Sequence, residues 1–132
     1  PPYSSAASDV YKRQIKGWSE NGKINEVVYD VICSDDRDIN NRNNKCKETK
    51  ASVNFENCSF DENYGSDRLE VIWTDTEYTP DQNTFYYARA IENPTCRWST
   101  YDSIRIDEKP AKNYPKIMRE MAWSSPIWIK NK

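Results

Sequence analysis

Apolar and polar side chains alternate along several short stretches of the chain, which is the period expected of half-buried β-strands. The clearest stretch is "KINEVVYDVIC", whose apolar face consists of Val27, Tyr29, Val31 and Cys33. It follows the sequence "SENG", in which the Asn21-Gly22 pair is a strong signal for a two-residue hairpin turn. We therefore predict an antiparallel hairpin that joins "QIKGW" to this second strand.

Later stretches repeat the alternation. They are "ASVNF", "RLEVIWTD" and "FYYARAIE", the last of which places Phe85, Tyr87, Arg89 and Ile91 on one side. A short helical turn is expected near Trp98–Ser103, after Pro94 ends the preceding strand. The final apolar piece, "IMREMAWSSPIWIK", alternates until Pro126 interrupts it. By contrast, "SDDRDINNRNNKCKETK" has no apolar period and is predicted to be a long polar loop.

Short strands separated by turn signals are typical of antiparallel sandwiches. We predict an all-β fold, an antiparallel β-sandwich of immunoglobulin-like type that is incomplete and carries an irregular C-terminal extension. The expected organisation is a tail at 1–14, a β-sandwich-like domain at 15–108, and an extension at 109–132 that packs on it. The tail "PPYSSAASDVYKRQ" resembles a translated library-adapter sequence found before reading frames in metagenomic collections, so we expect it to be non-native or disordered.

Composition limits the size of the core and the kinds of partner. The chain has 132 residues, enough for one domain, of which 36% are hydrophobic and 13% aromatic. A formal charge of -2 gives no basic field that would attract nucleic acid or anionic lipid. No apolar run approaches the roughly 20 residues that span a bilayer. We expect a soluble domain with no nucleic-acid partner and no membrane insertion.

The chain contains no histidine. Histidine is the commonest general base and metal ligand, and serine or cysteine nucleophiles usually depend on it. An ordinary catalytic triad or zinc hydrolase site therefore cannot be assembled from this chain. We predict no catalytic residue, no cofactor and no metal ligand, and hence no enzymatic activity of the chain by itself.

The four cysteines do not have the spacing of a CxxC metal site. An even number of cysteines with long gaps favours two disulfides formed in an oxidising compartment. Three pairings are possible in principle. We favour Cys33–Cys46, which closes the polar loop, and Cys58–Cys96, which ties the middle of the domain to a late loop. The alternative is a set of reduced, partly buried thiols.

The polar loop contains a weak signal for a cation site. Asp36, Asp38 and Asn40 match the start of a calcium-binding loop, in which alternate side-chain oxygens converge on the ion. The match then fails, because the sixth position is Asn41 rather than glycine and the twelfth is Lys47 rather than glutamate. A solvated loop cross-linked by a disulfide is the better interpretation.

The five tryptophans allow a binding platform. Exposed aromatic rings on a β-sandwich can stack on sugar rings, and Trp18, Trp98 and Trp128 could form such a platform with Tyr101. The alternative is that the tryptophans fill the core, as we expect for Trp73 from its alternation with the apolar residues before it. Core filling is favoured in a chain with so few leucines and isoleucines.

The run "WTDTEYTPDQNTFYYARAIENPTCRWSTYDSIRI" and the later "REMAWSSPIWIK" are similar to the C-terminal region of the domain-of-unknown-function 3604 family. The resemblance extends from Ile15 to Lys130. It implies a parent protein that is several times longer and often exported, with a front half like the PHP-type metal-dependent hydrolases. That front half opens with an Asp-x-His-x-His run, which this chain lacks, so its metal and catalytic residues have no counterpart here.

The resemblance leads us to expect a non-catalytic accessory domain of a larger protein, periplasmic or extracellular. Its partner would be the missing N-terminal, catalytic-like domain of the same polypeptide, and Arg89, Arg97 and Asp102 are the candidate interdomain contacts. For Arg89 the alternative is a salt bridge to a neighbour such as Glu92. The alternative function is a secreted, aromatic-rich binding module for a polysaccharide or a protein partner.

Overall fold

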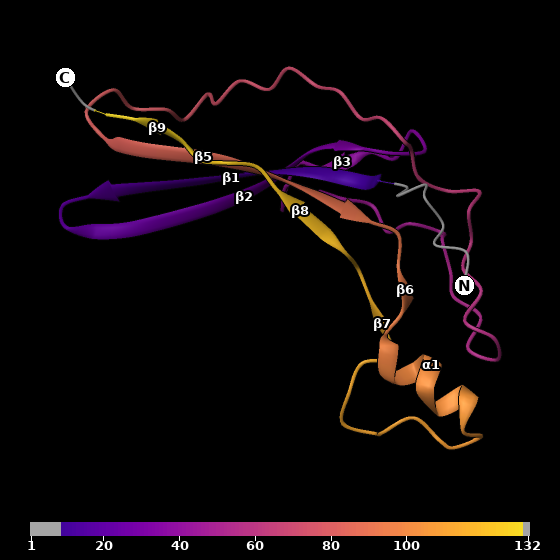
Figure 1. The fold of residues 1–132 in the computed structure, drawn as a ribbon. Coiled ribbons are helices and arrows are strands. Elements are labelled where there is room, and N and C mark those ends of the chain that lie inside the picture. Colours follow the sequence, from indigo (N-terminus) through magenta and orange to yellow (C-terminus); the bar gives the residue numbers. More distant parts are fainter. Residues whose placement is uncertain (1–8, 131–132) are drawn as a thin grey trace.

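A five-stranded antiparallel sheet dominates the structure, a computed structural model that describes residues 9–130. Its strands are β1 (Asp9–Glu20), β2 (Lys23–Cys33), β5 (Asn83–Glu92), β8 (Met121–Trp123) and β9 (Ile127–Ile129). The order is β2-β1-β5, and β8 and β9 pair with successive parts of the free side of β5 (Figure 1). The prediction of a mostly β fold with antiparallel strands is confirmed.

The hairpin at the start of the chain forms as predicted. Asn21 and Gly22 both have positive φ angles, 50° and 74°, which is the backbone geometry of the favoured two-residue hairpin turn. The register then runs outward from Glu20 opposite Lys23 as far as Tyr11 opposite Cys33, with one irregularity after Lys12. β1 extends beyond this hairpin pairing to Asp9, which lies opposite Glu92 of β5.

The predicted boundary of the β domain at Ile15 is therefore six residues too late, since β1 begins at Asp9. Residues 11–14 are ordinary members of the sheet, paired on one side with β2 and on the other with β5, and Asp9 pairs with Glu92 of β5. Alternation alone did not reveal them, because both faces of this part of β1 carry polar or charged residues. Residues 1–8 of the predicted tail lie outside the described residues.

The segment that leads into β5 runs along the sheet without pairing with any of its strands. Residues 67–82, which we call the strap, form no strand, although the alternation in "RLEVIWTD" predicted one. Figure 1 shows the strap running along the main sheet before it turns into β5. Side-chain hydrogen bonds hold it there, for example from Lys12 Nζ to the Leu69 carbonyl at 2.6 Å. The predicted strand in "ASVNF" is also wrong, apart from a single bridge between Val53 and Phe60.

Two small antiparallel sheets accompany the main one. The first joins β3 (Ile39–Asn40) to β4 (Lys45–Cys46), and the second joins β6 (Thr95–Cys96) to β7 (Ile117–Met118). The predicted helical turn is present as α1 (Trp98–Arg105), which lies with β6 and β7 beyond the end of the main sheet (Figure 1). The predicted extension at 109–132 contributes β8 and β9 to the main sheet itself. Among the described residues, no helix is long and apolar enough to cross a membrane.

The core is small and lies along the centre of the sheet. Ile15 on β1 and Ile91 on β5 are its most deeply buried apolar residues, at 0% and 1% exposure. Phe85 covers the neighbouring backbone so closely that a Cβ at Gly17 would overlap its ring. The glycine therefore lets an aromatic ring lie across β1, which increases the apolar area that a single sheet can bury.

Candidate functional site

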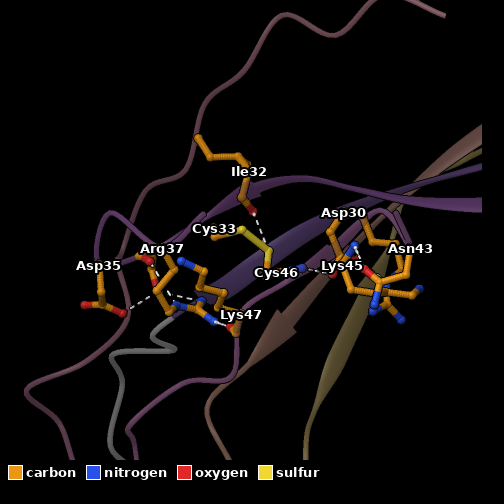
Figure 2. The surroundings of a disulfide bond; sticks show 11 residues. Asp30, Ile32, Cys33, Asp35, Arg37, Asn43, Lys45, Cys46 and Lys47 are labelled. Carbon is orange, nitrogen blue, oxygen red and sulfur yellow. Dashed lines mark hydrogen bonds and ion pairs between the residues drawn. A yellow bond between two sulfur atoms is a disulfide. The ribbon is translucent and has the colours of Figure 1, made fainter. Parts of the chain in front are cut away.

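Both favoured disulfides, Cys33–Cys46 and Cys58–Cys96, are present in the structure. The first closes the polar loop onto the end of β2. Figure 2 shows its surroundings, with Arg37 and Lys47 near one end of the loop and Asp30 and Asn43 near the other. Asp30 is buried and accepts hydrogen bonds from Arg13 Nε at 2.6 Å and from the Cys46 N–H at 2.9 Å. The loop is thus fixed to both long strands of the hairpin.

Two of the three side chains of the weak calcium pattern, those of Asp38 and Asn40, bind protein groups instead. Asp38 pairs with Lys47 at 2.7 Å, and the Asn40 side chain accepts a hydrogen bond from the Arg42 N–H. Lys47 occupies the position at which a calcium-binding loop has glutamate. Its ammonium group therefore provides the positive charge that pairs with Asp38. Within residues 9–130 no group of three or more acidic, cysteine or histidine side chains is arranged to hold a metal ion.

One face of the main sheet carries a row of aromatic residues around an arginine. The register places Trp128 opposite Phe85, and Trp123 opposite Arg89, so these side chains share one face with Tyr87. We call this surface the aromatic face: Phe85, Tyr87, Arg89, Trp123 and Trp128. The rings of Phe85 and Trp128 are 5.1 Å apart between centroids, and those of Phe85 and Tyr87 are stacked at 6.4 Å. Trp123 and Trp128 remain 60% and 66% exposed.

Arg89 lies between aromatic rings without an acidic partner among the described residues. Its guanidinium carbon is 5.3 Å from the Tyr87 ring centroid and 5.8 Å from that of Trp123, which is cation–π distance. Nη2 donates to the Tyr87 hydroxyl at 2.6 Å, whereas Nε is buried and has no hydrogen-bond partner in the described part of the chain. The alternative salt bridge to Glu92 is not formed, because residues three apart on a strand point to opposite faces.

The other two candidate contacts, Arg97 and Asp102, lie away from Arg89. Arg97 directly precedes α1 and its guanidinium stacks over the Tyr114 ring at 5.2 Å. Asp102 is exposed on α1, 3.9 Å from Arg105. No hydrogen bond or ion pair within the described residues joins either of them to Arg89. The three residues therefore do not form one site.

The proposed platform of four aromatic residues is also not assembled. Trp18 is directly opposite Thr84 and so lies on the reverse side of the sheet from Trp128. Trp98 and Tyr101 are exposed on α1. Trp73, which we expected in the core, is a partly exposed residue of the strap, and its ring lies next to those of Tyr29 and Tyr86, with centroid distances of 5.2 and 6.2 Å.

The reverse face of the sheet holds a buried ionic cluster that the sequence did not reveal. Lys16 and Asp75 pair at 2.6 Å, and their side chains are only 3% and 8% exposed. Tyr86 donates a hydrogen bond to the same carboxylate at 2.6 Å, and the Glu77 N–H donates to its other oxygen at 2.9 Å. Lys16 Nζ also donates to the Glu77 carbonyl at 3.0 Å, so the cluster joins β1 and β5 to the strap.

The titration of this cluster follows from its hydrogen bonds. Burial alone would raise the pKa of Asp75, but the hydrogen bonds from Lys16, Tyr86 and the Glu77 N–H outweigh burial and lower the pKa. Burial, followed by the hydrogen bond to Glu77, raises the pKa of Tyr29 to about 12. The Asp75 carboxylate is thus ionised and surrounded by donors, which suits a structural tether and not a general base. The only sequence signal was a lysine inside the apolar stretch "QIKGW".

Comparison with known proteins gives one match. A family model described as "Protein of unknown function (DUF3604)" matches residues 6–131, and so covers nearly the whole chain. This confirms the resemblance seen in the sequence. No curated protein and no solved structure matches the chain.

Proposed function

Since the chain belongs to the DUF3604 family of proteins of unknown function, we propose a role for it from the surface of its main sheet. It is a non-catalytic accessory β domain that docks on another domain through the aromatic face. The observation that carries this proposal is the pair of exposed tryptophans, Trp123 and Trp128, around a guanidinium that has no acidic partner among the described residues.

The chemistry of the aromatic face supports docking on protein. Large exposed aromatic side chains with an arginine at the centre are the residue types that dominate the energetics of protein interfaces. Arg89 has a buried Nε with no acceptor among residues 9–130, and burying an unsatisfied donor costs free energy unless a partner satisfies it. A second layer on this face would bury the tryptophans and supply an acceptor. The same layer would complete the immunoglobulin-like sandwich that we propose for the domain.

The proposed partner is a PHP-type, metal-dependent hydrolase-like domain of the same, longer polypeptide. The support is the resemblance noted in the sequence, which implies such a domain ahead of this region. The absence of histidine from this chain supports a non-catalytic role. Two disulfides support an exported protein, periplasmic or extracellular, since disulfides persist in oxidising compartments.

The test uses a longer polypeptide, obtained by extending the coding sequence upstream, and the variant Arg89→Ala. We expect the substitution to loosen the junction, so that limited proteolysis separates the two domains faster than in the unsubstituted protein. Arg68→Ala is the matched control, because Arg68 is an exposed arginine paired only with Glu70. Melting temperatures of the isolated chain with each substitution correct for any loss of stability within the β domain. Equal proteolysis rates for the two variants would contradict docking through this face.

A further inference from the structure

A shallow, open cavity of about 420 Å³ lies on the reverse face of the sheet, away from the aromatic face. Its floor consists of Gln14 on β1 and Tyr86 on β5, which lie on the face that the strap covers. The strap forms one wall with Trp73, Thr74 and Tyr78, and β9 forms the other with Ile127 and Ile129. The volume is within the usual range for small-molecule sites.

The charged group of the cavity is already neutralised by the protein. Asp75 lines the cavity, but its carboxylate accepts from Lys16, from the Tyr86 hydroxyl and from the Glu77 N–H. A cationic ligand would have to compete with a buried lysine at 2.6 Å, and an anionic ligand would find no unpaired cation among the residues that line the cavity. The cavity therefore favours a ligand without net charge.

Several neutral polar groups of the cavity are available for hydrogen bonds to a ligand. The Gln14 amide and the hydroxyls of Thr74 and Tyr78 make no side-chain hydrogen bond to any other described residue, whereas the Tyr86 hydroxyl is used by Asp75. An amide and a hydroxyl can each donate and accept. The cavity thus combines aromatic and aliphatic walls with a few adaptable hydrogen-bonding groups.

We propose that this cavity is a binding site for a neutral pyranose ring, as a free sugar or as a unit of a glycan. A pyranose has apolar C–H faces that pack on indole and phenol rings, and hydroxyls that pair with amides and hydroxyls. A purely apolar ligand would bury the Gln14 amide without a partner, which costs free energy. The site is on the opposite side of the sheet from the aromatic face. A result that contradicts docking through the aromatic face therefore leaves the sugar site untouched, and the reverse also holds.

The test is a titration of the chain with cellotriose, xylotriose and maltotriose, followed by NMR of the indole N–H signals. Trp73→Phe identifies the Trp73 signal. We expect at least one of these neutral trisaccharides to shift the Trp73 signal in a saturable manner at millimolar concentration. Tyr78→Ala, which removes one aromatic wall, should weaken binding about tenfold. Gln14→Leu, which keeps the volume but removes the amide, should weaken it as well.

Tyr101→Ala is the matched control, since Tyr101 is an exposed tyrosine on α1 and should leave binding unchanged. Parallel titrations with trigalacturonate and with the trimer of glucosamine compare anionic and cationic sugars. Binding of a charged trimer with no binding of the neutral ones would overturn the assignment of ligand class. No saturable shift of Trp73 with any trimer, or equal weakening by Tyr101→Ala, would overturn the site itself.

Discussion

At the scale of the residue, the Lys16–Asp75 pair is a buried ionic link between the main sheet and the strap. Both side chains are nearly inaccessible to water, and together they connect the strap to β1. An ion pair of this kind contributes little net stability compared with apolar packing, but removal of one partner leaves an uncompensated buried charge. The cluster therefore acts as a tether whose loss is costly.

We predict that Asp75→Asn destabilises the chain by about 3–5 kcal/mol at neutral pH, because it leaves the Lys16 ammonium buried without a counter-ion. Urea unfolding measures this free energy. The exposed pair of Arg68 and Glu70 is the control, and Glu70→Gln should cost no more than about 1 kcal/mol. Similar losses in the two variants would contradict the tether.

The Lys16–Asp75 pair should also make the free energy of unfolding depend on pH in the acidic range. The pKa of Asp75 is lower in the folded chain than its ordinary value of 3.8, so its contribution is complete above that value. The contribution is lost as the pH falls from 3.8 through the lowered pKa. Unfolding free energies measured at a series of acidic pH values should therefore fall more steeply for the unsubstituted chain than for Asp75→Asn.

At the scale of elements, the disulfides attach segments that hydrogen bonds alone hold weakly. Cys33–Cys46 fastens β4 to the end of β2, where Asp30 already binds the Cys46 N–H. Cys58–Cys96 links the irregular segment before the strap to β6, with a sequence separation of 38 residues compared with 13 for the other bridge. A cross-link restricts the unfolded chain more strongly when it closes a longer loop.

Accordingly, replacing Cys58 and Cys96 with alanine should destabilise the chain by about 1 kcal/mol more than replacing Cys33 and Cys46. The two double variants differ only in the loop that is opened, so each serves as the reference for the other. Denaturant unfolding under non-reducing conditions gives both values. A larger loss on opening the Cys33–Cys46 loop would mean that contacts of the polar loop in the folded state outweigh loop length.

At the scale of the whole molecule, part of the aromatic face of the main sheet is left uncovered. The strap covers the reverse face, while Trp123 and Trp128 on the aromatic face are more than half exposed. β2 is also an edge of the sheet, with backbone groups that can pair with another strand. A net charge of only -2 gives little electrostatic repulsion between copies.

We therefore predict that the isolated chain self-associates as its concentration rises, which sedimentation velocity detects. Replacing Trp123 and Trp128 with lysine should shift the equilibrium toward the monomer. Ile24→Lys is the control, because Ile24 is an even more exposed apolar residue near the hairpin tip. A monomer with a sharp, cooperative thermal transition at all concentrations would contradict the prediction.

Local signals in the sequence predicted part of this structure correctly. The sequence by itself predicts the Asn21-Gly22 turn, the alternation of β5, the short helix and both disulfide pairings. Each depends on residues near one another in sequence or on the chemistry of one residue type. The position of Arg89 on the same face as Phe85 and Tyr87 is predicted for the same reason, because it follows from strand alternation, whereas its role as an interdomain contact stays a prediction.

The tertiary structure alone determined the contacts between distant parts of the chain. Trp123 and Trp128 join the aromatic face only because β8 and β9 return to pair with β5. The strap has the alternation of a strand, yet side chains from β1 and β5 bind its carbonyls and Asp75, and it forms no ladder. Alternation records which residues face a surface, whereas strand pairing and burial of an ion pair depend on the partners that folding brings together.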